Sequence, residues 1–307
     1  RASTEPVSGD QIAETTGVSR VSVWKAVQAL VESGYGITSS RHGYTLEKDL
    51  DDSLFPWEFG NNENHFSHFA QVESTMNQAR NLAQKDNNSS IQIITADVQT
   101  SGKGHGDHSW TTTKGSLAFT VVLKSHIPSA LSSQVLMTAQ IALVQVLEEL
   151  SGRKFFVRWP NDIWSETGKV AGILDEVSAT GGVCNWVNIG VGVNLTKGPG
   201  LPKTDVVFSK ETEIGRKEVL TAFLNKFLGL AEEYHLTTES ETLTLPSSDS
   251  KLVDQWNALC MDSGKPLRLN GIESECICKG INRYGGLTVT NNGIDLDFLP
   301  GTINIIK

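Results

Sequence analysis

The stretch from Arg158 to Asn194 decides the interpretation of this sequence. It contains three blocks, which read Arg158-Trp159-Pro160-Asn161-Asp162, then Lys169-Val170-Ala171-Gly172-Ile173-Leu174-Asp175-Glu176, then Gly190-Val191-Gly192-Val193-Asn194. A glycine-rich loop precedes them and reads Gln99-Thr100-Ser101-Gly102-Lys103-Gly104-His105-Gly106. Two glycine loops, a rigid Pro-Asn-Asp turn and a lysine on an apolar strand together predict a site for an anionic, phosphorylated ligand.

The upstream loop carries a glycine at every second position from Gly102 to Gly106. Such glycines let the backbone approach a ligand closely and turn its N–H groups toward an anion. The spacing matches neither a Walker loop nor a dinucleotide fingerprint. By itself the loop fits a flexible hairpin tip equally well, and Lys103 and His105 favour anion binding.

Pro160 fixes its own φ angle and holds Trp159 extended, which makes Arg158 and the Asn161-Asp162 pair fixed points at a strand end. An Asn-Asp pair there can ligate Mg²⁺ or hold a ribose. It can equally cap a turn, and taken alone the turn interpretation is slightly favoured.

Lys169 opens an apolar strand, so its side chain either reaches back to water or faces a ligand. Gly172 inside that strand indicates that something packs against the backbone. The Gly190-x-Gly192-x-Asn194 block ends a strand in the same way, and Asn194 supplies both a donor and an acceptor. Each feature is weak alone, but all of them in one domain predict a binding site.

The bulk composition sets wider limits. A chain of 307 residues predicts two or three domains, and its formal charge of −9 argues against a protein coated for nucleic-acid binding. We expect a cytoplasmic protein without a membrane partner, because no apolar run is long enough to span a bilayer and no signal peptide opens the chain. The cysteines lack zinc-site spacing and are expected to be reduced structural thiols, namely Cys184, Cys260, Cys276 and Cys278.

Residues 1–47 predict a winged helix-turn-helix domain that binds DNA. One helix begins near Asp10 and ends at Gly17, Ser19 caps a second helix from about Arg20 to Ser33, and Tyr35–Leu46 reads as a hairpin wing. The apolar side of the second helix is assigned to Val21, Val23, Trp24, Val27, Leu30 and Val31. The residues expected to contact DNA are Ser19, Arg20, Ser22, Lys25, Gln28 and Arg41.

A helical cap whose polar face is only solvated is the alternative for this segment, because its acidic and basic residues nearly balance. A usual helix-turn-helix also has a helix before Gly9. Since the chain opens at Arg1 rather than Met, we expect this domain to be truncated at its N-terminus.

The remaining chain predicts an α+β fold. Residues 48–65 have the polar, acidic composition of a linker, 66–259 predict a central domain with a mixed sheet, and 260–307 predict a small SH3-like β-barrel. The central domain is expected to contain helices near Met76–Lys85, Leu131–Leu150 and Lys217–Tyr234 and strands at Ile91–Val98, Leu117–Lys124, Phe155–Arg158, Lys169–Val177 and Trp186–Val193. The barrel strands are expected at Pro266–Leu269, Glu275–Ile281, Gly286–Thr290 and Ile294–Leu299.

Taken in order, these motifs resemble those of the biotin protein ligases. The resemblance rests on Gln-Thr-x-Gly-Lys-Gly before Trp110, on Trp-Pro-Asn-Asp after Arg158, on the block from Lys169 to Glu176, and on Gly-x-Gly-x-Asn ending at Asn194. The N-terminal segment is similar to the DNA-binding domain of the bifunctional ligase-repressors through Gly17-Val18-Ser19-Arg20 and Gly43-Tyr44. Trp256-Asn257-Ala258-Leu259 also matches, so the resemblance covers nearly the whole chain.

The resemblance implies a two-step reaction. Biotin and MgATP give biotinyl-5′-AMP and pyrophosphate, and a lysine of a biotin carboxyl carrier protein then takes the biotin and releases AMP. It also implies a homodimer that binds operator DNA as a biotin-responsive repressor.

The resemblance also implies a role for each matching residue. Lys169 matches the catalytic lysine, and Lys103 with its loop is expected to close over the adenylate. The biotin-binding positions are Ser74, Thr75, Gln99, Gly102, Lys103, His105, Lys169, Gly172 and Leu174. The nucleotide-binding positions are Lys103, His105, Trp110, Arg158, Asn161, Asp162 and Asn194. Asn161 and Asp162 are the expected Mg²⁺ contacts.

Three positions depart from the family pattern. His105 stands where the loop usually has arginine, which predicts a weaker and pH-dependent hold on the intermediate. Met76 stands where Asn usually follows Ser-Thr, and Arg158 replaces a commoner lysine.

Two other functions fit parts of the same pattern. A lipoate ligase-like enzyme shares the expected fold but not the two terminal domains. A biotin- or adenylate-sensing repressor with weak or no ligase activity is slightly favoured by the altered loop of residues 102–108, whereas the retained Lys169 favours the ligase.

Overall fold

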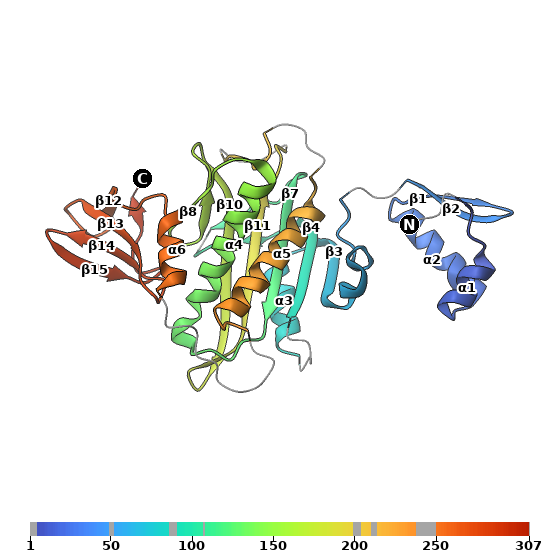
Figure 1. Cartoon of the computed structure of the whole chain (residues 1–307), viewed down its shortest axis with the longest axis horizontal. Helices are drawn as coiled ribbons and strands as arrows, with labels where there is room; N and C mark the ends of the chain where they lie inside the picture. The colour runs from blue at the N-terminus through green and yellow to red at the C-terminus, as the bar shows by residue number, and fades with distance from the viewer. Residues whose placement is uncertain are drawn as a thin grey trace. The chain divides into compact units, whose positions relative to one another are not determined.

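The computed structural model describes residues 5–48, 52–85, 91–106, 108–198, 204–209, 214–237 and 250–306. The chain divides into two compact units, Arg1–Ser53 and Leu54–Lys307 (Figure 1). Each unit is described by itself below.

The smaller unit consists of two helices and a hairpin. Helix α1 (Gly9–Thr16) begins at Ser8, whose hydroxyl accepts a hydrogen bond from Gln11 N at 3.0 Å, and it ends at Gly17 in the left-handed region. Helix α2 (Arg20–Glu32) is capped in the same way by Ser19, and strands β1 (Gly36–Ser40) and β2 (Gly43–Lys48) form the wing. The predicted helix-turn-helix and hairpin are therefore confirmed.

The assignment of the apolar side of α2 is partly wrong. Only Val23 and Val27 of this helix are buried, whereas Val21 is 63% exposed and Trp24 is 53% exposed. Within the described part of this unit, few apolar side chains pack against α2, so its other apolar residues stay exposed.

The larger unit is built on a mixed seven-stranded sheet, as predicted. Its strand order is β3-β4-β7-β11-β10-β9-β8, and only the β3–β4 pair is parallel. The strands are β3 (Phe66–Val72), β4 (Ile91–Gln99), β7 (Ser116–Leu123), β8 (Phe156–Arg158), β9 (Asp162–Trp164), β10 (Lys169–Thr180) and β11 (Val183–Asn194).

The two faces of this sheet differ. Helices α4 (Ser133–Ser151) and α5 (Arg216–Glu233) lie side by side over one face (Figure 1), where the odd-numbered residues of β11 from Val187 to Val193 join the main core. The shorter helix α3 (Thr75–Ala83) packs on the opposite face, where Ala79 meets Ile94 and Val122. The second face is covered only in part, which leaves room for a binding site.

Helix α4 revises one expectation. The helical segment Ser129–Ser151 includes the short 3-10 helix η2 (Ser129–Leu131). By length and composition alone it could cross a membrane, whereas the sequence had predicted that no apolar run is long enough to do so. However, 78% of its most apolar window is buried inside the protein, as expected for the central helix of a core.

The predicted linker is shorter than 48–65. Residues 49–51 lie outside the described residues, but Leu54 is buried and Pro56–His65 forms the 3-10 helix η1. Glu58 of this helix is buried and pairs with Lys217 of α5 at 2.9 Å. Polar composition suggested a solvated chain here, whereas an ion pair and flanking aromatic residues hold the segment against the larger unit.

The C-terminal segment forms a five-stranded antiparallel sheet, consistent with the predicted SH3-like barrel. Helix α6 (Lys251–Leu259) leads into it, and the strands lie in the order β15-β14-β13-β12-β16. They span β12 (Pro266–Leu269), β13 (Cys276–Ile281), β14 (Leu287–Asn291), β15 (Ile294–Phe298) and β16 (Ile305–Ile306). Asn292 and Gly293 both have positive φ in the β14–β15 turn, as an Asn-Gly hairpin requires. The four cysteines are all free and buried.

Candidate functional site

A cavity of about 530 Å³ opens on the partly covered face of the large sheet. Its wall is formed by the start of α3, the glycine loop, the Trp-Pro-Asn-Asp turn, strands β10 and β11, and residues 301–305 of the C-terminal segment. The glycine loop and the three blocks between Arg158 and Asn194 therefore meet at one place.

Glycines make the floor of this cavity. A Cβ atom at Gly192 would come within 2.3 Å of Cε2 of Trp110, and one at Gly172 would lie 3.4 Å from the same indole and from Lys169 Nζ. A Cβ atom at Gly190 would lie 2.7 Å from the sulfur of Met76. Trp110 and Met76 thus lie on the bare backbone of β11, which explains the Gly-x-Gly pattern.

One end of the cavity is lined by neutral polar groups. Gln99 Oε1 accepts hydrogen bonds from the backbone N–H of Thr75 at 2.8 Å and from its hydroxyl at 3.1 Å, and Thr120 donates to the Thr75 hydroxyl at 2.8 Å. Ser74 is fully buried and caps α3 through a 3.3 Å bond from Met76 N. This network fixes the start of α3 and presents hydroxyl and amide groups to a ligand.

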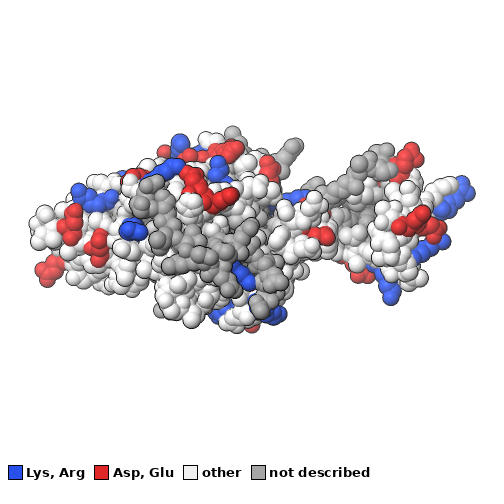
Figure 2. Space-filling model, turned by 60° about the horizontal axis from the view of Figure 1, so that its bottom comes forward, with Lys and Arg blue, Asp and Glu red and all other residues white. Residues whose placement is uncertain are grey.

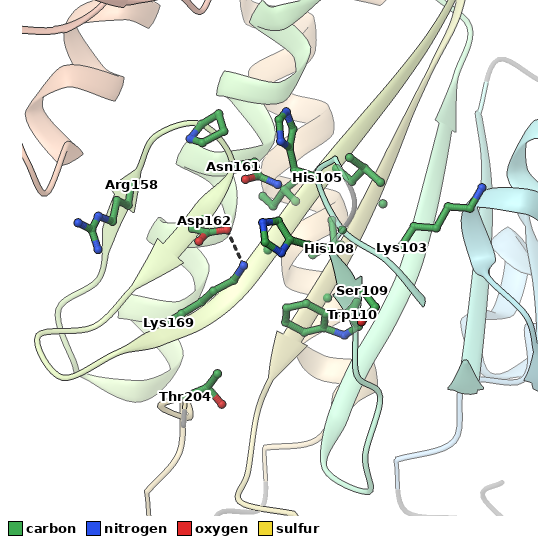
Figure 3. Close-up of a pocket in the computed structure, with 18 of the residues that line it drawn as sticks. Lys103, His105, His108, Ser109, Trp110, Arg158, Asn161, Asp162, Lys169 and Thr204 are labelled. Atoms are coloured by element: carbon green, nitrogen blue, oxygen red, sulfur yellow. Dashed lines mark ion pairs between the residues drawn. The ribbon is translucent and has the colours of Figure 1, made fainter. Parts of the chain in front are cut away.

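The other end carries a lysine–aspartate pair. Lys169 Nζ lies 2.6 Å from Asp162 Oδ1 and 5.8 Å from the centre of the Trp110 ring. Asp162 and Gly172 face each other in the β9–β10 register, and the N–H of Ile173 donates to Asn161 O at 2.8 Å. Figure 3 shows both side chains directed toward each other beside His108.

The Trp-Pro-Asn-Asp turn is held by residues distant in sequence. The Trp159–Pro160 peptide is cis, and Trp159 Nε1 donates to Gly285 O of the barrel at 3.0 Å. Arg158 Nε lies 3.1 Å from Asp262 Oδ2, and the guanidinium lies over the Trp164 ring. The barrel therefore fixes this turn relative to the cavity.

The glycine loop forms a short ribbon over the cavity. Strand β5 (Gly102–Lys103) pairs with β6 (Ser109–Trp110), and Gly104 N donates to His108 O at 2.8 Å. His105 and His108 point into the cavity, whereas the Lys103 side chain points away from the Lys169–Asp162 pair (Figure 3).

A strap at Thr204–Ser209 closes the cavity beside Lys169. Asp205 N donates to Lys169 O at 3.0 Å, and Asn194 Nδ2 donates to the Thr204 hydroxyl at 3.3 Å. Although burial alone would raise it, the pKa of Asp205 is lowered to about 2, because Ser165, Thr167 and Arg153 donate hydrogen bonds to its carboxylate.

Most of the predicted site residues line this cavity, and two do not. Asn194 and Gly102 stay behind the wall, where Asn194 anchors the strap and Gly102 lies against Trp110 O. The residues that do line it are Ser74, Thr75, Gln99, Lys103, His105, Trp110, Arg158, Asn161, Asp162, Lys169, Gly172 and Leu174.

Sequence reasoning missed His108, Ser109 and Thr204, which also line the cavity. His108 and Ser109 follow the quoted loop directly, so their place in the same ribbon was a usable signal. Thr204 lies in a stretch without periodicity and gave none.

The expected Mg²⁺ contacts do not form a metal site by themselves. Within the described ranges, no group of three or more His, Cys, Asp and Glu residues is arranged to hold a metal ion. The Asp162 carboxylate is already engaged by Lys169. A magnesium ion here would take most of its ligands from nucleotide phosphates, as this ion commonly does.

The predicted DNA-binding residues lie on the smaller unit. Arg20, Ser22, Lys25 and Arg41 are exposed, and Gln28 is half-buried. Ser19 is used as the helix cap, and Arg20 lies 3.4 Å from Asp10 with both side chains exposed. Figure 2 shows acidic and basic side chains interspersed over the visible face rather than one extended basic surface.

Comparisons with known proteins agree with this arrangement. The model of the biotin/lipoate A/B protein ligase family matches residues 68–194, and an HTH domain model matches residues 1–45. The bifunctional ligase/repressor BirA of Bacillus subtilis is 32% identical over 209 residues, or 65% of this chain and 63% of that protein. The match thus spans less than two thirds of that relative.

Two further proteins extend the likeness over more of the chain. BirA of Escherichia coli is 25% identical over 97% of this chain and 92% of that protein. The structure of the Aquifex aeolicus biotin protein ligase with biotin and ATP has the same fold, with a TM-score of 0.61 and 20% identity over 79% of this chain and 99% of that one. Residues 68–194 therefore resemble the biotin/lipoate A/B protein ligase family, in a chain whose N-terminal segment matches a helix-turn-helix domain.

Proposed function

We propose that this protein is an ATP-dependent biotin protein ligase that also acts as a biotin-responsive repressor. The observation that carries the ligase proposal is the single cavity with neutral polar groups at one end and the Lys169–Asp162 pair at the other. A substrate with a polar uncharged head and a carboxylate tail fits such a cavity.

The first step joins two anions. A carboxylate oxygen of biotin attacks the α-phosphorus of ATP, the bond from that phosphorus to the bridging oxygen breaks, and pyrophosphate leaves with its electron pair. Cationic and N–H groups must offset the repulsion between the reactants and the charge that grows at phosphorus. Lys169 supplies the cation by turning from Asp162 to the substrate oxygens.

In the second step the amine of a carrier-protein lysine attacks the acyl carbon, and AMP leaves. The mixed anhydride must survive until the carrier arrives, so water must be kept away from it. Trp110, His105 and the ribbon that holds them cover the cavity and serve this purpose.

Each polar group near Ser74 has a role toward the head of biotin. The hydroxyls of Ser74 and Thr75 and the amide of Gln99 bind its ureido ring, while Gly172 and Leu174 line the wall. Arg158, Asn161 and Asp162 bind the nucleotide, and Mg²⁺ arrives with the triphosphate. Asn194 acts indirectly by anchoring the strap that carries Thr204.

The test is incubation of the protein with MgATP, labelled biotin and a biotin carboxyl carrier domain. We expect label on the carrier and one pyrophosphate released per biotin activated. Lipoate in place of biotin serves as the control substrate, and label from lipoate alone would support the lipoate ligase-like alternative. Biotin binding without pyrophosphate release would instead support a sensing repressor without ligase activity.

The DNA function rests on the helix-turn-helix unit, whose exposed Arg20, Lys25 and Arg41 suit phosphate contacts. Biotinyl-5′-AMP orders the loops, favours a homodimer and so matches two half-sites of operator DNA. The protein works in the cytoplasm, where its nucleotide, carrier and DNA partners are found.

A further inference from the structure

Asn188 of β11 is a fully buried side chain whose amide is unused. Its exposure is 0%, and among the described residues neither its Nδ2 nor its Oδ1 has a hydrogen-bond partner. A buried polar group left without partners is unfavourable, because it loses its hydrogen bonds to water, so native structures rarely keep one without a reason.

The strand register places Asn188 under helix α3. It lies between Val122 of β7 and Glu176 of β10. Val122 packs with Ala79 of α3, and Glu176 accepts two hydrogen bonds from Arg80 of α3. Since side chains alternate along a strand, Asn188 also shares its face with Gly190 and Gly192, the floor of the cavity.

Met76 separates this amide from the cavity. Its sulfur lies over Gly190, one step along the same face from Asn188, and Met76 lines the inner wall while Asn188 does not. Methionine is unbranched and changes rotamer at little cost. A small rotation of this one side chain would extend the cavity along β11 toward the unpaired amide.

We infer that Asn188 is a specificity-determining residue that binds the urea ring of biotin when Met76 moves aside. This inference rests on the proposed function. A cyclic urea carries a carbonyl oxygen flanked by N–H groups, and a primary amide complements it, because Nδ2 donates to the carbonyl and Oδ1 accepts from one N–H. The ring would then satisfy the two atoms of Asn188 that have no partner without it.

The test measures binding of biotin alone by calorimetry to the full chain and to Asn188→Leu, which keeps the volume but removes the amide. We expect biotin affinity to fall at least tenfold, while the melting temperature of the ligand-free protein stays the same or rises because the unpaired amide is gone. The matched control is Asn185→Leu on the same strand, where the side chain is exposed, and it should bind biotin as the unaltered protein does.

A second variant, Met76→Ala, removes the side chain that must move and should bind biotin more tightly. A folded Asn188→Leu protein whose affinity stays within twofold of the unaltered protein would overturn the inference and leave the ligase proposal intact. If Asn188→Leu does not fold, Asn188→Thr, which keeps only one polar group, should still bind biotin more weakly than the unaltered protein, and unchanged binding would again overturn the inference. Absence of biotin binding by the unaltered protein would reject both proposals together.

Discussion

At the scale of single residues, the charge at the active end of the cavity is set before any substrate arrives. Lys169 and Asp162 are 30% and 24% exposed, and their 2.6 Å contact holds the ammonium against the turn. Since the ammonium already lies beside the cavity, only a short turn of this side chain is needed when a substrate anion replaces the carboxylate as its partner.

Replacing this cation tests its role. We expect Lys169→Met to lower kcat/KM for pyrophosphate release by about 10²–10³-fold, the usual loss when one preorganised charge-stabilising group is removed. Biotin binding should weaken much less. Lys265→Met, at an exposed position of the barrel, is the control and should leave the rate unchanged. A loss below threefold for Lys169→Met would contradict the assignment.

His105 predicts how long the intermediate is retained. Its imidazole lines the cavity where the resemblance implies an arginine, and it offers fewer hydrogen-bond donors to an anion than a guanidinium would. His105→Arg should therefore slow the loss of biotinyl-5′-AMP in a release assay, because a guanidinium makes charge-assisted hydrogen bonds to phosphate oxygens. Equal release rates in the two proteins would remove His105 from that role.

At the scale of elements, the Thr204–Ser209 strap supports the strand that carries Lys169. Arg153 contacts three groups of this strap, because it donates to the carbonyls of Val206 and Val207 and to the carboxylate of Asp205. The strap in turn holds Lys169 O and Asn194 O through its own N–H groups. Its stability therefore affects both glycine strands of the floor.

Asp205→Asn should destabilise the larger unit by about 1–2 kcal/mol near neutral pH, a value reduced because the carboxylate is 20% exposed. Its pKa is about 2 in the folded protein, below that of an unfolded aspartate. A depressed pKa stabilises the fold above about pH 4, and this contribution is lost as the pH falls from about 4 to about 2. Urea unfolding at both ends of this window measures it, and a constant difference between the two proteins would contradict it.

Elements with a clear apolar pattern were predictable, and those held by distant partners were not. The β10 and β11 strands follow from long apolar runs next to glycine, and α4 from its apolar periodicity. Strand β3 and helix η1 were missed, because Phe66–Val72 does not alternate regularly and Pro56–His65 is largely polar, and both are held by distant partners, β4 and Lys217.

The candidate site was predictable as a set of motifs but not as a geometry. Sequence placed Lys169 and Asp162 in one site, yet nothing local indicated that they pair directly or that Met76 lies on Gly190. Such contacts depend on strand register and on the position of α3, which a single sequence does not encode in its local pattern.

At the scale of the whole molecule, the proposed function gives the two units separate tasks. Arg41→Ala in the wing should weaken binding to the upstream DNA of its own gene. It should also reduce the slope of the logarithm of the binding constant against the logarithm of salt concentration by about one, because one phosphate contact is lost. Arg268→Ala, an exposed barrel residue, should change neither. Carrier biotinylation should be unchanged in both proteins, and a loss of ligation in Arg41→Ala would contradict this division.

The C-terminal barrel is a structural part of the candidate site. Gly285 and Asp262 hold the Trp-Pro-Asn-Asp turn, and residues 301–305 line the cavity. Loss of the barrel would therefore remove part of the cavity wall and release the turn that carries Asp162, so a truncation there would damage the candidate site itself.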